Sequence, residues 1–297
     1  MKSVIIAIPN DPSLAERLGK KGSVNSITFY NRKADDLILT ILTPSDVEEK
    51  YYAVPESILM SDIVILSSRN PDSLFGESLI ACSLLGKDVI ITDESDVSKL
   101  LSGFKLKCAV LGPDAILDYL KSYEPRPRPA GAKRVDIDKA FPVKGVGDIL
   151  LGFTTAGTIS KHDKLLHSSG KEVLIRSIQS QDEDVDSAGV GTRVGLAIKG
   201  AVYSDFDKGD VISDRQIPKV SEFSAKVEVS PLARINIDGM ACSIASGFSF
   251  SNATLKADGA DVRVSAERKI AVAIGDRFLL VKGDKPRIFG AGTISKV

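Results

Sequence analysis

The sequence predicts an α/β domain followed by two β-barrels. Three observations lead to this prediction. Short apolar runs alternate with helix-compatible stretches over residues 1–122, a segment rich in proline and arginine follows, and the remainder consists of short alternating segments separated by glycine-containing turns. With 297 residues, the chain is long enough for two or three domains of ordinary size.

Five short runs rich in valine and isoleucine indicate the strands of the first domain. Runs of this kind are typical of strands buried on both faces of a parallel sheet. Stretches suited to helices separate them, so the alternation predicts an open, mainly parallel α/β sheet. The expected strands are 3–8, 37–42, 62–67, 88–92 and 107–111, and the expected helices are 12–18, 45–60, 73–85, 95–101 and 113–123.

The segment 123–134, Y-E-P-R-P-R-P-A-G-A-K-R, favours an extended spacer because its prolines alternate with other residues. Its basic side chains either contact phosphates or only keep the spacer soluble. After it, glycine-containing turns recur between short alternating segments, a pattern typical of β-barrels. We therefore expect an α/β domain at 1–122, the linker at 123–134, and barrels at 135–215 and 216–297.

Composition excludes several classes of protein. A hydrophobic content of 43% is too high for general disorder, and 39 basic residues balance 39 acidic ones. The cysteines Cys82, Cys108 and Cys242 lie far apart, which supports neither a disulfide framework nor a thiolate zinc site. No apolar stretch approaches the roughly 20 residues of a membrane span. We expect a cytoplasmic protein without a metal site or a membrane partner.

The two halves of the chain differ in charge. Residues 1–124 carry 13 Lys and Arg against 18 Asp and Glu, whereas residues 125–297 carry 26 against 21. A polyanion would therefore be attracted to the C-terminal half. Two ordinary surfaces explain the same counts equally well.

The most specific signal lies in residues 138–213. In order, they contain F-P-V-K-G-V-G, G-T-I-S-K-H-D-K-L, I-R-S-I-Q, G-T-R-V-G-L-A-I-K-G and D-K-G-D-V-I. This series resembles the second domain of translation GTPases of the EF-Tu and SelB kind, most strongly the archaeal SelB branch. The SelB-like factor associated with pyrrolysine is one candidate within that branch. The tail 287–294, R-I-F-G-A-G-T-I, likewise resembles the closing strand of the family's third domain.

The resemblance implies that the α/β domain is a P-loop GTPase-like domain with degenerate motifs. The family's phosphate loop, G-x-x-x-x-G-K-[ST], needs glycines so that amides converge and a lysine that neutralises phosphate charge. The corresponding stretch here reads I-P-N-D-P-S-L. Its prolines remove amide donors, Asp11 would repel phosphate, and Asn10 offers no positive charge. Only Ser13 resembles a magnesium-binding hydroxyl.

The other nucleotide-binding motifs of the family also lack their functional residues in this sequence. The family's D-x-P-G-H becomes L-T-P-S-D at 42–46, and its guanine-reading N-K-x-D becomes T-D-E-S at 92–95. The chain's two histidines, His162 and His167, both lie in the expected first barrel, so none can orient a catalytic water in the α/β domain. We expect no GTP hydrolysis and no cofactor; GTP and magnesium are suggested by family resemblance alone. Weak GTP binding through divergent contacts and an α/β domain of other descent remain as alternatives.

In EF-Tu-like factors, the second domain binds the aminoacyl end of tRNA, and the resemblance implies that task here. Asp138 matches the family's acidic pocket position, suited to a charged α-amino group. The remaining candidates for the aminoacyl and tRNA 3′ end are Lys139, Arg176, Gln179 and Arg193. Arg193 has an alternative role as a strand-end arginine paired with Asp182 or Asp184.

The third domain of the family holds the tRNA backbone. Scattered positive charge in the last 82 residues suits this role, although a solvated face has the same composition. The histidines are better explained as solvated polar residues than as metal ligands. The candidates for tRNA backbone contact are Lys256, Arg263, Arg268 and Arg287, accompanied by Lys269 and Lys285.

We thus expect a translation elongation factor homologue, a pseudo-GTPase by its motifs, that binds aminoacyl-tRNA without GTP hydrolysis. The ribosome is a further expected partner, and DNA is not. Two alternatives remain: a working GTP-binding elongation factor with divergent motifs, and a non-catalytic scaffold for protein interactions.

Overall fold

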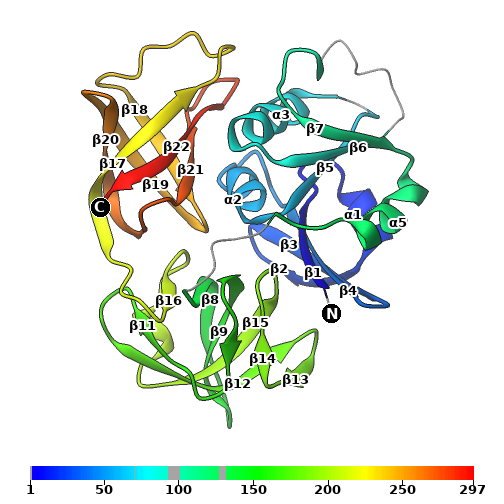
Figure 1. The fold of residues 1–297 in the computed structure, drawn as a ribbon, viewed down its shortest axis with the longest axis vertical. Helices are drawn as coiled ribbons and strands as arrows, with labels where there is room; N and C mark the ends of the chain where they lie inside the picture. Colours follow the sequence, from blue (N-terminus) through cyan, green and yellow to red (C-terminus); the bar gives the residue numbers. More distant parts are fainter. Residues whose placement is uncertain (1, 70, 93–100, 127–131) are drawn as a thin grey trace.

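The computed structural model describes residues 2–69, 71–92, 101–126 and 132–297. Figure 1 shows them in three lobes: the α/β domain at the upper right, a barrel of green strands below it, and a barrel of yellow to red strands at the upper left. Among the described residues, no helix combines the length and apolar character needed to cross a bilayer. The predicted fold class, an α/β domain followed by β-barrels, is confirmed.

The α/β domain contains a seven-stranded sheet in the order β2-β3-β4-β1-β5-β6-β7. Strands β4, β1, β5, β6 and β7 are parallel neighbours, while β2 and β3 run antiparallel at one edge. The strands are β1 (Lys2–Ala7), β2 (Lys20–Val24), β3 (Ile27–Ala34), β4 (Leu37–Pro44), β5 (Ile63–Ser67), β6 (Asp88–Thr92) and β7 (Lys107–Leu111).

Each strand predicted for this domain is present, but the expected double-sided burial is wrong for β7. This strand lies at the sheet edge and pairs with β6 alone among the described strands, and Val110 is 55% exposed. The sequence pattern also did not reveal β2, whose residues K-K-G-S-V are mostly exposed and lack an apolar run. That strand exists because it pairs with β3, which is itself buried against the sheet.

Helices cover both faces of the sheet. Helices α2 (Ala53–Met60) and α3 (Ser73–Leu85) pack on one face, and α1 (Pro12–Leu18) and α5 (Ile116–Ser122) pack on the other. The expected helix 45–60 is wrong in its first half, because turns precede α2. The expected helix 113–123 divides into a 3-10 turn (Pro113–Ala115) and α5, and the helix predicted over 95–101 falls almost entirely outside the described residues.

The first barrel is an antiparallel sheet in the order β11-β16-β8-β9-β15-β12-β13, which closes through pairing of β11 with β12. Its interior holds side chains such as Val135, Leu150 and Leu196. A separate short pair, β10 (Ile159–Ser160) and β14 (Ser187–Ala188), lies beside it. The barrel strands are β8 (Arg134–Val143), β9 (Gly147–Ala156), β11 (Lys164–His167), β12 (Glu172–Ser180), β13 (Glu183–Val185), β15 (Arg193–Lys199) and β16 (Val211–Ser213).

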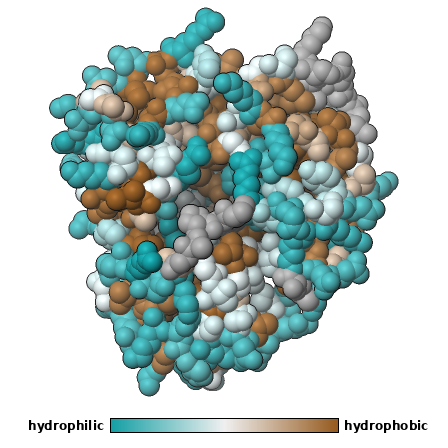
Figure 2. Space-filling view, in the orientation of Figure 1, coloured by the Kyte–Doolittle hydropathy of each residue, from teal (hydrophilic) through white to brown (hydrophobic). Residues whose placement is uncertain are grey.

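The second barrel is closed in the order β17-β20-β19-β18-β21-β22. Part of its wall packs against α3, because Leu279, Ile288 and Ala291 join the apolar cluster beneath that helix. Figure 2 shows hydrophobic residues gathered mainly over the two upper lobes on this face. The strands are β17 (Lys219–Val229), β18 (Ala241–Ser246), β19 (Ser249–Asp258), β20 (Asp261–Ala271), β21 (Arg277–Val281) and β22 (Ile288–Lys296).

A small apolar core forms where the three domains meet. Phe29 of β3, Phe153 of β9 and Phe248 at the β18–β19 turn are each at most 1% exposed. The ring centroid of Phe153 lies 6.1 Å from that of Phe29 and 5.8 Å from that of Phe248. The three rings are as buried as side chains inside a domain and lie at the spacing of packed aromatic pairs. Separation of the domains would therefore expose their apolar surface to water.

We expect Phe153→Ala to lower the free energy of unfolding by about 3 to 5 kcal/mol, because it removes the central ring of this core. Phe141→Ala, in the adjoining strand at a half-buried position, should cost clearly less. Denaturant unfolding followed by circular dichroism measures both variants. Equal losses would contradict a packed core between the domains.

Candidate functional site at a domain junction

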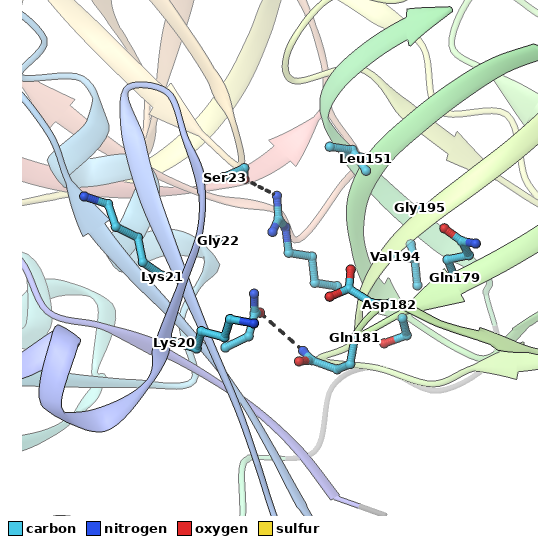
Figure 3. Close-up of a pocket in the computed structure, with 13 residues that line it drawn as sticks. Lys20, Lys21, Gly22, Ser23, Leu151, Gln179, Gln181, Asp182, Val194 and Gly195 are labelled. Carbon is cyan, nitrogen blue, oxygen red and sulfur yellow. Dashed lines mark hydrogen bonds between the residues drawn. The ribbon is translucent and has the colours of Figure 1, made fainter. Parts of the chain in front are cut away.

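A polar cleft lies between the α/β domain and the first barrel. Its volume is about 370 Å³. Strand β2 forms one wall, and the barrel strands β12 and β15 with the turn after β12 form the other, as Figure 3 shows. The lining residues are Lys20, Lys21, Gly22, Ser23 and Asn31 from the α/β domain, and Leu151, Gln179, Ser180, Gln181, Asp182, Arg193, Val194 and Gly195 from the barrel.

Arg193 connects the two walls of the cleft. It is the first residue of β15, opposite Phe153 of β9, and both side chains face the α/β domain. Its Nη2 donates a hydrogen bond to Ser23 Oγ at 2.8 Å, and the guanidinium carbon lies 3.9 Å from the centre of the Phe29 ring. Burial lowers the pKa of Arg193 below its usual value, although the charges of Asp138 and Asp182 oppose this.

The structure gives Arg193 different partners from the pair expected at a strand end. It contacts Ser23 and Phe29 of the α/β domain, while Asp182 acts on it through charge and Asp184 instead accepts a hydrogen bond from Gln179. Its Nε is buried and has no hydrogen-bond partner among the described residues. A buried donor without a partner is costly, so this atom is suited to a ligand group with an acceptor oxygen.

Asp138 is buried and does not line the cleft. The register of β8 against β9 shifts between Ile137 and Lys139, so Asp138 occupies a bulge, a feature that redirects a side chain. It is 6% exposed, and within the described parts of the chain its Oδ2 has no hydrogen-bond partner. Burial raises the pKa of Asp138 above its usual value, and the positive charges of Lys208, Arg193 and Lys139 partly offset the rise.

The other predicted 3′-end residues divide between the cleft and the outer surface. Gln179 lines the cleft and donates to Asp184 Oδ1 at 3.0 Å. Lys139 lies with its Nζ 5.7 Å from the centre of the Phe141 ring, and Arg176 donates to the Val146 carbonyl at 3.2 Å. The structure therefore brings Gln179 and Arg193 together, but neither Lys139 nor Arg176 lines the cleft.

Two lysines of the cleft, Lys20 and Lys21, were not predicted from the sequence as site residues. Both are exposed on β2, the strand whose existence the sequence pattern did not reveal. Two adjacent lysines before a glycine were the available signal, but nothing in the sequence placed them near Arg193. With Arg193 and one carboxylate, Asp182, they give the cleft an excess of positive charge, which attracts phosphate groups.

The loop between β1 and α1 is held by its own contacts. Asn10 bridges to the end of β5, donating to the Ser67 carbonyl at 2.8 Å and accepting from the Ser67 amide at 3.0 Å. Asp11 accepts from the Leu14 amide at 3.0 Å and from Ser13 Oγ at 2.6 Å. Burial alone would raise the pKa of Asp11, but these hydrogen bonds lower it below its usual value. Asp11 thus caps α1, Ser13 supports this cap, and Asn10 fastens the loop to β5.

The predicted backbone-binding cations occupy different parts of the second barrel. Lys256 and Arg263 lie opposite each other on β19 and β20, and Arg263 is also level with Ser224 and Lys296 across the sheet. This row places exposed cations on one outer face, with Arg263 also pairing with Asp258 at 3.1 Å.

Arg268 and Arg287 do not join this row. Arg268 donates to the Phe250 carbonyl at 2.6 Å. Arg287 faces the α/β domain, where its guanidinium carbon lies 4.3 Å from the centre of the Tyr51 ring and its side chain is 16% exposed. Its backbone amide donates to Glu77 Oε1 at 2.7 Å.

The basic residues near the linker pair with carboxylates. Arg126 pairs with Asp88, Lys133 binds Asp163 at 2.7 Å, and Arg134 is the first residue of β8 and contacts Asp276 of the second barrel at 2.7 Å. These ion pairs indicate that Arg126, Lys133 and Arg134 stabilise the fold. Arg128 lies outside the described residues.

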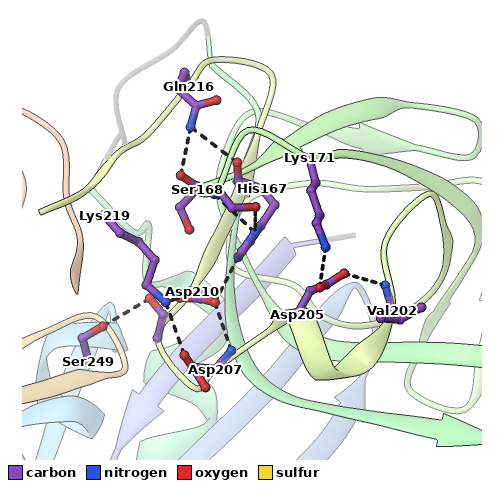
Figure 4. A network of polar contacts seen from close by, with 12 residues as sticks. His167, Ser168, Lys171, Val202, Asp205, Asp207, Asp210, Gln216, Lys219 and Ser249 are labelled. Atoms are coloured by element: carbon purple, nitrogen blue, oxygen red, sulfur yellow. Dashed lines mark hydrogen bonds and ion pairs between the residues drawn. The ribbon is translucent and has the colours of Figure 1, made fainter. Parts of the chain in front are cut away.

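His167 is not the solvated residue that the sequence suggested. It is 2% exposed, its Nε2 lies 3.0 Å from Asp210 Oδ2, and its Nδ1 lies 2.8 Å from Ser169 Oγ. Lys219, the first residue of the second barrel, contacts Asp210 at 2.6 Å (Figure 4). Burial alone would raise the pKa of Asp210, but hydrogen bonds from His167 and Lys219 lower it below its usual value. This network fixes one barrel against the other, and no group of three potential metal ligands occurs among the described residues.

Comparisons with known proteins agree with this architecture. Residues 137–213 match the family model described as elongation factor Tu domain 4. An uncharacterized protein of Methanocaldococcus jannaschii is 27% identical over 95% of this chain and 96% of its own length. The selenocysteine-specific elongation factor of the same organism is 33% identical, but the match covers 35% of this chain and only 23% of that factor.

A solved structure has the same fold. Translation elongation factor SelB from Methanococcus maripaludis, in complex with the GTP analogue GPPNHP, superimposes with a TM-score of 0.83 at 19% identity, covering 99% of this chain and 79% of that one. The likeness extends over all three domains of the chain. Residues 137–213 thus match a domain of elongation factor Tu in sequence, and the whole chain has the fold of SelB. The link to pyrrolysine stays a prediction.

We expect Asn10→Ala to lower the free energy of unfolding by about 1 to 3 kcal/mol, because it leaves the buried backbone groups of Ser67 without partners. Ser13→Ala, at an exposed contact, should cost less. Thermal and denaturant unfolding measure both. An unchanged stability of the Asn10 variant would contradict a structural role for this loop.

Proposed function

We propose that this protein binds the acceptor end of aminoacyl-tRNA in the cleft between the α/β domain and the first barrel, without GTP hydrolysis. The observation that carries the proposal is the cleft itself. Three cationic residues, Lys20, Lys21 and Arg193, line with Gln179 a space of about 370 Å³. Terminal nucleotides offer phosphates to the cations and base edges and hydroxyls to the amide.

The family supports the assignment to tRNA. The part of the chain that matches elongation factor Tu contains Asp138, Gln179 and Arg193. Of these, Gln179 and Arg193 line the cleft, and the buried carboxylate of Asp138 lies close enough to act on the charge of Arg193. The outer row of Lys256, Arg263 and Lys296 offers a second set of cations for the tRNA backbone. The ribosome is a further proposed partner, by family.

Binding without nucleotide follows from the β1–α1 loop. A triphosphate needs free amides and a lysine, whereas here Asp11 accepts the amide of Leu14 in the first turn of α1, and Asn10 is bound to Ser67. The carboxylate of Asp11 would also repel the phosphates. The proposed pseudo-GTPase character rests on these contacts.

Calorimetric titration with GTP and magnesium tests this part of the proposal. We expect no heat of binding at protein and nucleotide concentrations in the micromolar range, and no GTP turnover with or without ribosomes. A dissociation constant in the micromolar range would contradict the proposal and favour a working nucleotide-binding factor.

Filter binding with charged and uncharged tRNA tests the cleft. The double variant Lys20→Ala/Lys21→Ala should bind tRNA several-fold more weakly. It should also make the dependence of the association constant on salt less steep: the slope of its logarithm against the logarithm of the salt concentration should shrink in magnitude by about 1 for each phosphate that is no longer neutralised. Aminoacylated tRNA should bind more tightly than uncharged tRNA, because the aminoacyl group fills a part of the cleft that the uncharged 3′ end leaves empty.

The matched control is Lys105→Ala/Lys107→Ala, which removes the same charge from a different part of the α/β domain. It should leave affinity and salt slope nearly unchanged. If both double variants weaken binding equally, the loss is explained by net charge alone and the cleft is not the binding site. If the wild type does not bind tRNA detectably at low salt, the proposed function is refuted.

A further inference from the structure

Lys208 lies where the three domains meet. It belongs to the loop before β16 in the first barrel, and its Nζ lies 5.2 Å from the centre of the Tyr52 ring of the α/β domain and 5.7 Å from that of Phe248 in the second barrel. The same Nζ donates to Ser26 Oγ at 3.2 Å and forms a close ion pair with Glu56 of α2. One side chain thus links all three domains.

The backbone beside Lys208 is fixed. Gly209 has a φ of +90°, and a Cβ built there would lie 2.2 Å from Ser249 Oγ of the second barrel. Its amide donates to the Ile137 carbonyl at 2.8 Å, and its carbonyl accepts from Ser249 Oγ at 3.2 Å. Because this loop is held between the barrels, the backbone of Lys208 stays with the barrels if the α/β domain moves away.

Glu56 shares this lysine with a second carboxylate. Glu56 is 1% exposed, and the nearby Asp138, whose Oδ2 lacks a hydrogen-bond partner among the described residues, is 6% exposed. Arg193 and Lys139 also act on Asp138, but Arg193 is bound to Ser23. The cation that holds Glu56 by a hydrogen bond is Lys208, against the repulsion of Asp138.

Titratable groups on the other elements around α2 are engaged elsewhere. Glu77 of α3 accepts from the hydroxyl of Tyr51 at 2.8 Å and from the amide of Arg287. Tyr52 meets Lys208 through its ring. The ionisation of Glu56 is thus governed by its burial, by Lys208 and by Asp138.

Burial works against the charged form of Glu56. It raises the pKa of Glu56 to about 7, although the charge of Lys208 and its hydrogen bond lower it and Asp138 adds to the rise. A carboxylate that loses its hydration is stable only when its partners compensate, and here Lys208 faces two carboxylates.

We propose that Glu56 and Lys208 form a proton-operated latch between the α/β domain and the barrels. Proton uptake by Glu56 tightens the junction, and proton loss loosens it and widens the cleft lined by Lys20 and Arg193. The proposal rests on the proposed function only in linking the latch to tRNA; the latch itself is a property of the free protein.

Linkage between proton binding and domain closure gives the direction of the effect. When the domains separate, water surrounds Glu56 and its pKa returns toward 4.5, so the closed form holds the proton more tightly than the open form. The contribution of Glu56 to the stability of the closed form relative to the open form is complete below about pH 4.5. This contribution is lost as the pH rises toward about 7. Within this window the ratio of open to closed protein rises by up to about tenfold per pH unit.

Hydrogen exchange of the free 297-residue chain measures the opening. Amides of α2 and of the Lys208 loop are followed by mass spectrometry between pH 5.5 and 7.5, with rates divided by those of the unfolded chain. We expect opening to increase about tenfold or more in the wild type. Glu56→Gln, a neutral side chain of the same shape, should remove this increase and keep the junction closed throughout.

Glu49→Gln is the control, because Glu49 is exposed and lies outside the junction. It should retain the wild-type profile. If Glu56→Gln and the wild type show the same pH dependence, the latch is refuted.

A second variant keeps the test independent of how well Glu56→Gln folds. Asp138→Asn removes the repelling carboxylate, so the upper end of the pH window should move to lower pH. An unmoved or raised window would overturn the assignment. Because these measurements contain no RNA, their failure would leave the proposed function standing, and failed tRNA binding would leave the latch standing.

Discussion

The arrangement of the molecule depends on one buried junction. Phe29, Phe153 and Phe248 come from three domains and pack in a row, with the Lys208–Glu56 ion pair at its edge. Interfaces between domains within a chain are usually polar and permit motion. This one instead has the character of a core, so separating the domains exposes aromatic surface, which opposes opening, while the hydration of ionised Glu56 favours it.

The cleft follows from that junction. Its two walls belong to different domains, and Arg193 joins them by stacking on Phe29 and bonding to Ser23. In a switch protein, a bound nucleotide would set the relation between such walls. Here the loop that would hold the nucleotide is bound by Asn10 to Ser67, and we infer that packing sets the relation instead.

The sequence predicted those features that depend on local pattern. Apolar runs indicated the buried strands, and the motif order indicated the first barrel, which the match to elongation factor Tu confirms. It did not predict β2, because K-K-G-S-V acquires its structure only by pairing with β3. Nor could it predict the partners of His167 or of Lys208, since Glu56 lies 152 positions from Lys208 in the chain. Contacts of that range depend on how the domains pack.

Site-specific photo-cross-linking from position 179 tests the proposed tRNA site most directly. A photoreactive amino acid replaces Gln179 on the barrel wall of the cleft, and aminoacyl-tRNA labelled at its 3′ end is added without nucleotide. We predict a cross-link to the terminal nucleotides, with a yield that GTP and magnesium do not change. A yield that appears only with GTP, or a cross-link confined to positions far from the 3′ end, would contradict nucleotide-independent binding in this cleft.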